Sequence, residues 1–91
     1  MERKIDFFKV VDYPLMTEKA VNMIEKENKL VFVLKKREFT KKDVKQVIEE
    51  EFKVKVEKVN TLIDRKGRKR AIVKLKKEFS AQDIATKLGI I

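Results

Sequence analysis

The sequence predicts an α/β fold of the α+β type: an open, mostly antiparallel sheet of three to four strands with flanking helices, in one compact domain over residues 1–91. Segments with the apolar spacing of helices alternate with segments rich in β-branched residues. The last two strand-like segments are separated by a short charged connection, which is typical of an antiparallel hairpin. A chain of 91 residues also suffices for a single two-layer core.

The first half of the chain contains one helix and one central strand. The apolar segment Ile5–Val11 fits either an edge strand or a helical turn, and Pro14 follows it closely. Thr17 is placed to cap a helix at 18–26, where apolar residues recur at a spacing of three and four. Apolar residues on both parities of Leu30–Leu34 predict a central strand that is covered on both faces.

A second helix and a third strand follow. The segment Thr40–Asp43 is a variant of the capping box, which predicts a helix over Lys41–Phe52. In the strand expected at Val54–Ile63, the apolar residues change parity partway along. Because a change of parity moves side chains to the other face, it predicts a β-bulge near Glu57–Lys58.

The C-terminal third completes a hairpin and adds a short helix. The connection Asp64–Arg68 leads into a strand at 70–75 whose apolar residues alternate with polar ones, as in a strand buried on one side. We expect this strand to pair with the preceding one in antiparallel fashion. The segment Ser80–Asp83 is expected to cap a last helix, and Gly89 is placed to end it.

Composition excludes most enzyme classes. The chain has no cysteine and no histidine, so disulfides, thiolate metal sites and the commonest general base are absent. Its two glycines, Gly67 and Gly89, cannot build a Walker loop or a dinucleotide fingerprint. We therefore expect no enzyme, cofactor, metal or small-molecule substrate. The longest apolar run, Leu30–Leu34, is too short for a membrane span, so we expect no membrane insertion and a cytoplasmic location.

The positive charge lies in two short windows. Lys29–Ile48 holds seven basic residues against two acids, and Asp64–Lys77 holds eight against one. The rest of the chain is slightly acidic, although the whole carries a net charge of +9. Because a concentrated field of one sign attracts polyanions, this pattern predicts a nucleic-acid partner.

The helix at 41–52 carries charges that oppose its dipole. Lys41 and Lys42 stand in the first turn and Glu49–Glu51 in the last. A phosphate at the N-terminus would be favourable there, so we expect both lysines to face nucleic acid together with Lys35, Lys36 and Arg37. The alternative is that these are solvated surface lysines.

The hairpin is the second expected binding site. The hairpin connection carries a dense row of like charges, so we expect it to be mobile in the free protein and ordered when it binds phosphates. The alternative role of these charges is to prevent pairing at the sheet edge. Few aromatic residues are placed for base stacking, which favours recognition of folded RNA by shape and backbone, with Asn60 and Thr61 reaching sugars or bases. The full set of residues expected to bind RNA is Lys35, Lys36, Arg37, Thr40, Lys41, Lys42, Asn60, Thr61, Arg65, Lys66, Arg68, Lys69 and Arg70.

Three motifs resemble one known family. The segments Tyr13–Ala20, Val56–Leu62 and Lys69–Lys76 are similar in order and spacing to the archaeal branch of the large-subunit ribosomal protein twenty-three family. The resemblance implies a four-stranded antiparallel sheet that binds the third domain of large-subunit rRNA beside the mouth of the polypeptide exit tunnel. It also implies a neighbour, ribosomal protein twenty-nine, and docking of signal recognition particle or translocon-type factors.

The resemblance assigns a docking role to one acid. In bacterial relatives the glutamate of the Ser/Thr-Glu-Lys motif contributes to factor docking, and the matching residue here is Glu18. The alternative for Glu18 is simple stabilisation of the helix by an acid in its first turn. Bacterial members have a long hairpin that reaches into the tunnel, whereas Asp64–Arg68 is short, which argues against a tunnel-lining role here.

Two other functions compete with the ribosomal one. A free-standing basic binder, such as an archaeal chromatin or RNA-chaperone protein, would show the same charge windows. A small hydrolase of acyl phosphates would need only an arginine and an asparagine, but no glycine-rich phosphate loop supports it. The three motifs favour the ribosomal role.

Overall fold

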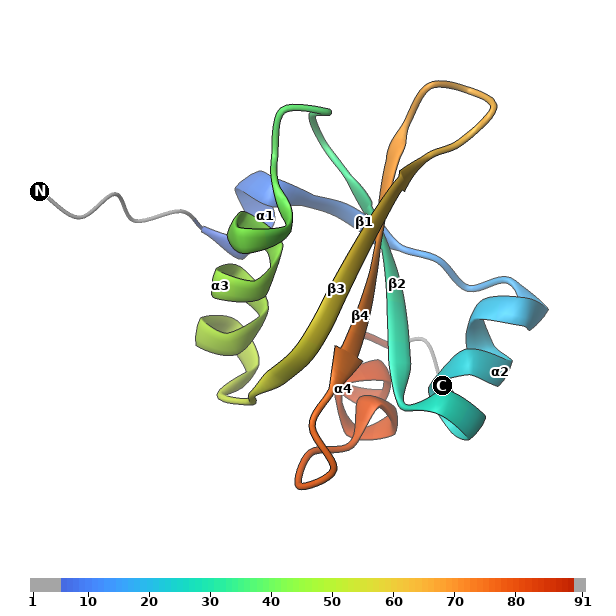
Figure 1. Ribbon diagram of the computed structural model, residues 1–91. Coiled ribbons are helices and arrows are strands. Elements are labelled where there is room, and N and C mark those ends of the chain that lie inside the picture. The colour runs from blue at the N-terminus through green and yellow to red at the C-terminus, as the bar shows by residue number, and fades with distance from the viewer. Residues whose placement is uncertain (1–5, 90–91) are drawn as a thin grey trace, which may run out of the picture.

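The structure, a computed structural model, describes residues 6–89 and contains one four-stranded sheet with helices around it (Figure 1). All strand pairs are antiparallel, and the strand order is β1-β2-β4-β3. Within the described residues, no helix is long and apolar enough to cross a membrane. The elements in chain order are α1 (Phe7–Val10), β1 (Val11–Pro14), α2 (Glu18–Glu27), β2 (Lys29–Leu34), α3 (Lys41–Phe52), β3 (Val56–Ile63), β4 (Lys69–Leu75) and α4 (Ala81–Lys87).

The N-terminal segment contains both of the alternatives that its sequence left open. A single helical turn, α1, is capped by the Asp6 carboxylate, which accepts a hydrogen bond from the Phe8 amide. The edge strand β1 then begins at Val11 and pairs with β2 through a register shift before Tyr13. Ile5, where the predicted segment began, lies outside the described residues.

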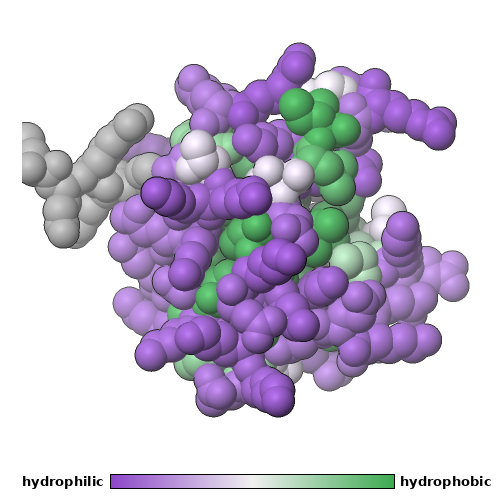
Figure 2. All heavy atoms as spheres, in the orientation of Figure 1, coloured by the Kyte–Doolittle hydropathy of each residue, from purple (hydrophilic) through white to green (hydrophobic). Residues whose placement is uncertain are grey.

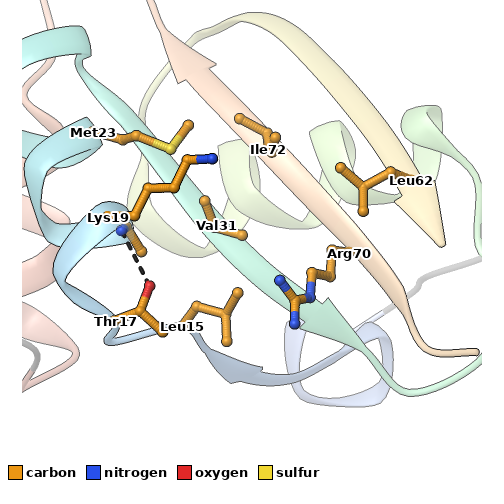
Figure 3. Close-up of a pocket in the computed structure, with 9 residues that line it drawn as sticks. Leu15, Thr17, Lys19, Met23, Val31, Leu62, Arg70 and Ile72 are labelled. Atoms are coloured by element: carbon orange, nitrogen blue, oxygen red, sulfur yellow. Dashed lines mark hydrogen bonds between the residues drawn. The ribbon is translucent and has the colours of Figure 1, made fainter. Parts of the chain in front are cut away.

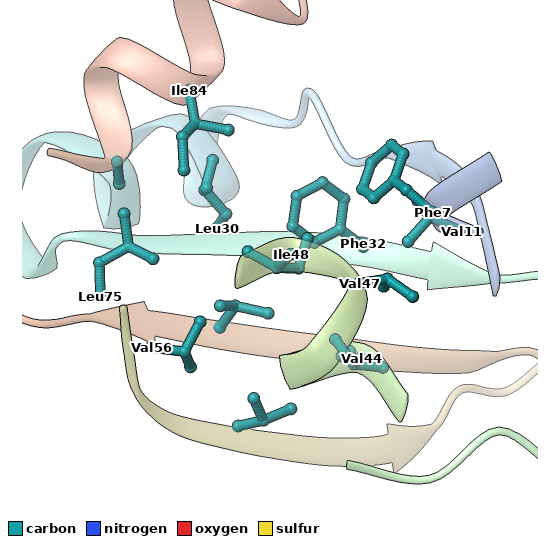
Figure 4. Close-up of a cluster of buried hydrophobic side chains, with 14 of the residues drawn as sticks. Phe7, Val11, Leu30, Phe32, Val44, Val47, Ile48, Val56, Leu75 and Ile84 are labelled. Atoms are coloured by element: carbon teal, nitrogen blue, oxygen red, sulfur yellow. The ribbon is translucent and has the colours of Figure 1, made fainter. Parts of the chain in front are cut away.

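The core lies on one face of the sheet, beneath α1, α3 and α4. Figure 4 shows Val44, Val47 and Ile48 of α3 and Ile84 of α4 directed toward the strands. Phe32 of β2 is fully buried and meets the Phe7 ring edge-on, with the ring centroids 6.1 Å apart. The predicted helix at 41–52 is confirmed, because its buried stripe is the one that the apolar spacing indicated.

The strand β2 is interior, as its sequence predicted. Every residue from Leu30 to Leu34 is buried, because β1 and β4 flank the strand and its second face is covered in part by α2. The helix α2 lies beside the half of β2 that β1 does not reach (Figure 1). Its predicted cap is confirmed, since Thr17 Oγ1 accepts a hydrogen bond of 3.2 Å from the Ala20 amide.

The hairpin of β3 and β4 also forms as predicted, with the register shift between Val56 and Lys58. The strand begins at Val56, two residues later than expected. Lys53 ends α3 in the left-handed conformation, and the Glu49 carboxylate accepts a 2.9 Å hydrogen bond from the Val56 amide. Residues 53–55 therefore connect the end of α3 to the start of β3, and Val54 packs against the core without belonging to the strand.

The predicted cap of α4 is wrong. Ser80 occupies the cap position, but its side chain makes no capping hydrogen bond. Asn28 replaces it: Asn28 Oδ1 accepts a 2.7 Å hydrogen bond from the Ala81 amide, and Nδ2 donates to the carbonyls of Leu75 and Phe79. Asn28 itself ends α2 with φ of 56°. One asparagine thus joins the α2–β2 turn to the start of α4.

We predict that Asn28→Gly destabilises the fold by about 2 kcal/mol, because three hydrogen bonds to backbone groups are lost. Asn28→Ala should cost about 1 kcal/mol more, since alanine lacks the freedom of glycine in the left-handed conformation. Urea unfolding of both variants checks this. Equal losses would show that the backbone conformation contributes nothing, and wild-type stability in both would refute the role of the side chain.

Candidate nucleic-acid interface

Ten of the fifteen cations in the two basic windows lie at one end of the molecule. Because β2 and β4 are antiparallel neighbours, with Val33 paired to Arg70, the end of β2 lies beside the start of β4. The β2–α3 loop and the β3–β4 hairpin therefore both extend from the upper end of the sheet in Figure 1. Lys69 Nζ donates a 3.2 Å hydrogen bond to the Arg37 carbonyl, which joins the two segments.

We call this surface the basic end and define it by its ten cations. Seven are exposed and three, just before and at the start of β4, are half-buried. The one acid in the β2–α3 loop, Glu38, lies 3.8 Å from Lys36 in a pair that is open to solvent, so it neutralises little of the charge. The residues of the basic end are Lys35, Lys36, Arg37, Lys41, Lys42, Arg65, Lys66, Arg68, Lys69 and Arg70.

The hairpin tip makes hydrogen bonds of its own, and the expected mobility of the free tip stays a prediction. The Gly67 amide donates to the Asp64 carbonyl at 3.0 Å, and the Asp64 amide donates to the Arg68 carbonyl at 2.9 Å. Gly67 has φ of +80°, a conformation that favours glycine. Asp64 closes this turn through its backbone, and its side chain makes further contacts within the hairpin.

The Asp64 carboxylate binds three donors. Oδ1 accepts hydrogen bonds of 2.9 Å from the Lys66 and Arg68 amides, and Oδ2 accepts one of 3.1 Å from Arg70 Nε. The pKa of Asp64 is lowered chiefly by the Arg68 amide; desolvation opposes this, and the Lys66 amide and the guanidinium groups of Arg70 and Arg68 add to it. Sequence reasoning treated Asp64 only as part of the connection, although Asp is typical of turn starts.

Tyr13 is a second contributor that sequence reasoning missed. The Arg68 guanidinium lies over the Tyr13 ring, 5.8 Å from its centroid, and Arg68 Nη1 donates to the Tyr13 hydroxyl. The tyrosine belongs to β1 and the arginine to the hairpin, 55 residues later. Because only the folded sheet brings them together, no local sequence signal could have identified the pair.

The N-terminus of α3 carries an internal anion. The predicted capping box is confirmed: Thr40 Oγ1 accepts from the Asp43 amide, and Asp43 Oδ2 accepts a 2.8 Å hydrogen bond from the Thr40 amide. Thr40 Oγ1 also donates to Asp43 Oδ2. The hydroxyl of Thr40 is thus engaged within the chain, and the exposed ammonium groups of Lys41 and Lys42 are the parts of this turn that face solvent.

The structure does not bring Asn60 and Thr61 together. As neighbours in β3 they point to opposite faces of the sheet. Asn60 is exposed on the open face, where it lines a hollow with Lys58 and Lys74, and Thr61 is half-buried on the core side. Neither side chain joins the basic end.

The open face of the sheet holds an apolar hollow of about 130 Å³. Figure 3 shows Val31 and Ile72 on neighbouring strands, with Met23 and Lys19 of α2 on one side and Arg70 on the other. Figure 2 shows apolar side chains among hydrophilic ones on this view. Leu62, which lines the hollow, is 44% exposed.

Glu18 lies apart from the basic end. It is the first residue of α2, it is exposed, and it borders an open hollow with Asn22 and Glu27 of the same helix. In Figure 1, α2 and α3 lie on opposite sides of the sheet. The acid expected to dock protein factors and the cations expected to bind RNA therefore occupy different surfaces.

A four-stranded antiparallel sheet with helices on its faces and ten cations gathered at one end define a small, basic, open-sheet α+β protein. A family model described as ribosomal protein L23 matches residues 9–78. The chain is 50% identical over 86 residues to large ribosomal subunit protein uL23 of Methanothermobacter thermautotrophicus, covering 94% of this chain and 99% of that one. It is 48% identical, with the same coverage, to large ribosomal subunit protein uL23 of Methanococcus aeolicus.

The chain belongs to the ribosomal protein L23 family. It is a structural protein of the large ribosomal subunit, in the cytoplasm, and not an enzyme. The resemblance found in the sequence is thereby confirmed, and the chromatin-protein and hydrolase alternatives are set aside.

We predict that the hairpin titrates only at low pH. Because the folded pKa of Asp64 lies below its unfolded value, the stability it contributes is complete above the ordinary value of about 3.9 and is lost as the pH falls through the folded pKa. The NMR amide shifts of Lys66 and Arg68 should stay constant on acidification to about pH 4 and move together below it. Asp64→Asn should abolish this titration; a transition above the ordinary value would contradict the prediction.

Proposed function

We propose that this protein binds the third domain of large-subunit rRNA, beside the mouth of the polypeptide exit tunnel, through its basic end. The observation that supports the proposal is the meeting of the two basic windows, which the contact between Lys69 and Arg37 joins into one surface. Seven exposed cations, on two adjacent loops and the first turn of α3, form an arrangement that can follow a phosphate backbone. The arginines add bidentate contacts that lysine cannot make.

The ten cations support this proposal more than the three polar residues do. Thr40 uses its hydroxyl in the capping box, and Thr61 is half-buried on the core side of the sheet. Asn60 is exposed on the open face, where it would contact RNA only if the RNA strand extended past the hairpin onto this face. We therefore assign recognition chiefly to phosphate contacts, which suits binding by shape to folded RNA.

We also propose that the side of the molecule with α2 is a docking face for nascent-chain factors, with Glu18 as a contact residue. Its exposure and its separation from the basic end support this, because RNA and a protein factor could then bind at the same time. Met16, which is 65% exposed, places an apolar side chain near this acid. The partners proposed from the family are ribosomal protein twenty-nine, signal recognition particle and translocon-type factors.

We predict that a variant with five loop and helix cations neutralised binds rRNA more weakly and with a flatter salt dependence. With about 6 phosphate contacts, the wild type should lose on the order of a thousandfold in affinity between about 50 and 200 mM salt. Binding titrations against a third-domain fragment across this range measure both slopes. The substitutions, all to glutamine, are at Lys35, Lys36, Arg37, Lys41 and Lys42.

A charge-matched control separates this site from general charge. Five exposed lysines outside the basic end are replaced by glutamine, which gives the same net charge but should leave the salt slope nearly unchanged. Equal slopes in the two variants would refute the basic end as the binding surface. Equal affinity of the wild type for the fragment, duplex DNA and an unrelated structured RNA would refute specific rRNA binding. The control positions are Lys26, Lys55, Lys76, Lys77 and Lys87.

We predict that Glu18→Ala weakens the docking of signal recognition particle to assembled ribosomes about threefold or more while rRNA affinity stays unchanged, because a charged contact at an interface is lost. Glu25→Ala, at an exposed position on the same helix, is the control for a change of charge. Co-sedimentation with ribosomes measures docking. Retained docking in Glu18→Ala, or the same loss in both variants, would show that Glu18 only stabilises the helix.

A further inference from the structure

Residues 64–70 of the β3–β4 hairpin carry one acid, Asp64, among five basic residues. A carboxylate at this position repels the phosphates that its neighbours attract. Considered by charge alone, Asp64 should weaken RNA binding, and its removal should strengthen it. The contacts of its two oxygens lead to the opposite expectation.

Each oxygen of Asp64 fixes a different part of the hairpin. Oδ1 accepts from the Lys66 and Arg68 amides at 2.9 Å and so holds the backbone of the tip. Oδ2 accepts from Arg70 Nε at 3.1 Å and so holds the Arg70 side chain of β4; it also lies 3.6 Å from Arg68 Nε, in an ion pair without a hydrogen bond. The Asp64 side chain is only 9% exposed, so it faces the hairpin rather than an approaching phosphate.

The cations around Asp64 differ in their freedom. Arg70 is bound to Asp64, and Arg68 is bound between Asp64 and the Tyr13 ring. Arg65 and Lys66 are exposed on the tip that the carboxylate closes. Together with Ile63 these residues line an open hollow of about 490 Å³, whose shape therefore depends on the Asp64 contacts.

We propose that Asp64 is a positioning residue for RNA recognition, which fixes the hairpin backbone and the Arg70 guanidinium so that Arg65, Lys66 and Arg68 present their donors before RNA arrives. The inference rests on the rRNA binding proposed above. Fixing the donors in advance reduces the conformational entropy that binding would otherwise cost. The repulsion between the Asp64 carboxylate and the RNA phosphates is small by comparison, because the guanidinium of Arg70 already neutralises the carboxylate.

The test compares affinities for a third-domain rRNA fragment. Asp64→Asn keeps an oxygen for the two amides but loses the charged anchor for Arg70, and Asp64→Ala loses both. We expect Asp64→Asn to bind about three- to tenfold more weakly than the wild type although it adds positive charge, and Asp64→Ala to bind more weakly still. Glu38→Gln adds the same charge at the same end of the molecule without this anchor, and it should bind as tightly as the wild type or more tightly.

Two further readouts separate positioning from general loss of structure. In the free protein, ¹⁵N relaxation should show increased mobility of the residue 65–68 amides in Asp64→Asn, with core amides unchanged and an unfolding temperature that stays well above that of the binding assay. The preference for the third-domain fragment over an unrelated structured RNA should fall as well. Should Asp64→Ala fail to fold, Asp64→Asn decides the question.

The outcomes distinguish this inference from the proposed function. If the wild type prefers the third-domain fragment and Asp64→Asn binds it as tightly as Glu38→Gln does, the positioning role is wrong and rRNA binding stands. If the wild type shows no preference among RNAs, rRNA binding is wrong and the positioning role fails with it. Weaker binding with unchanged hairpin relaxation would also overturn the inference, because the carboxylate would then act without ordering the tip.

Discussion

The antiparallel pairing of β2 with β4 is the constraint on which the rest of the structure depends. It places Phe32 opposite Ala71 and Leu30 opposite Val73 on the face that α3 and α4 cover. A slip by one residue would turn these side chains to the open face and expose the core, so burial fixes the register. The same pairing sets the β2–α3 loop beside the β3–β4 hairpin. The core and the basic end are therefore consequences of one register.

Polar side chains complete backbone hydrogen bonding at the places where elements meet. Asn28 joins the α2–β2 turn to the start of α4, Glu49 accepts from the first amide of β3, and Asp43 closes the N-terminus of α3. Asp64 does the same for the hairpin. Asn28 is neutral, but the other three belong to the charged residues that make up 43% of the chain. They contribute to the fold by satisfying backbone amides. The charge of the chain thus serves the fold as well as its partners.

The distribution of charge is consistent with a protein that binds RNA on one side and protein factors on another. The seven exposed cations of the basic end lie on two loops and the first turn of α3, whereas Glu18 belongs to a helix on the other side of the sheet. Beside these cations, the Asp64 carboxylate is turned inward onto Arg70. This arrangement keeps the attraction for phosphate while it restrains side chains that repel one another. It follows from local turn chemistry combined with a long-range contact to Tyr13.

The sequence by itself determined α2, β2, α3, the β3–β4 hairpin with its bulge, α4 and the family, because periodicity, turn residues and motif spacing are local properties; it left the N-terminal segment open between helix and strand. It also identified the capping box of α3 through Thr40 and Asp43. The cap of α4 was predicted wrongly because Asn28, 53 residues away from Ala81, competes with Ser80. Only the tertiary structure placed Arg37 beside the hairpin and set Arg68 on Tyr13. Strand order and register decided these contacts, and both arise from the burial of apolar side chains that lie far apart in the chain.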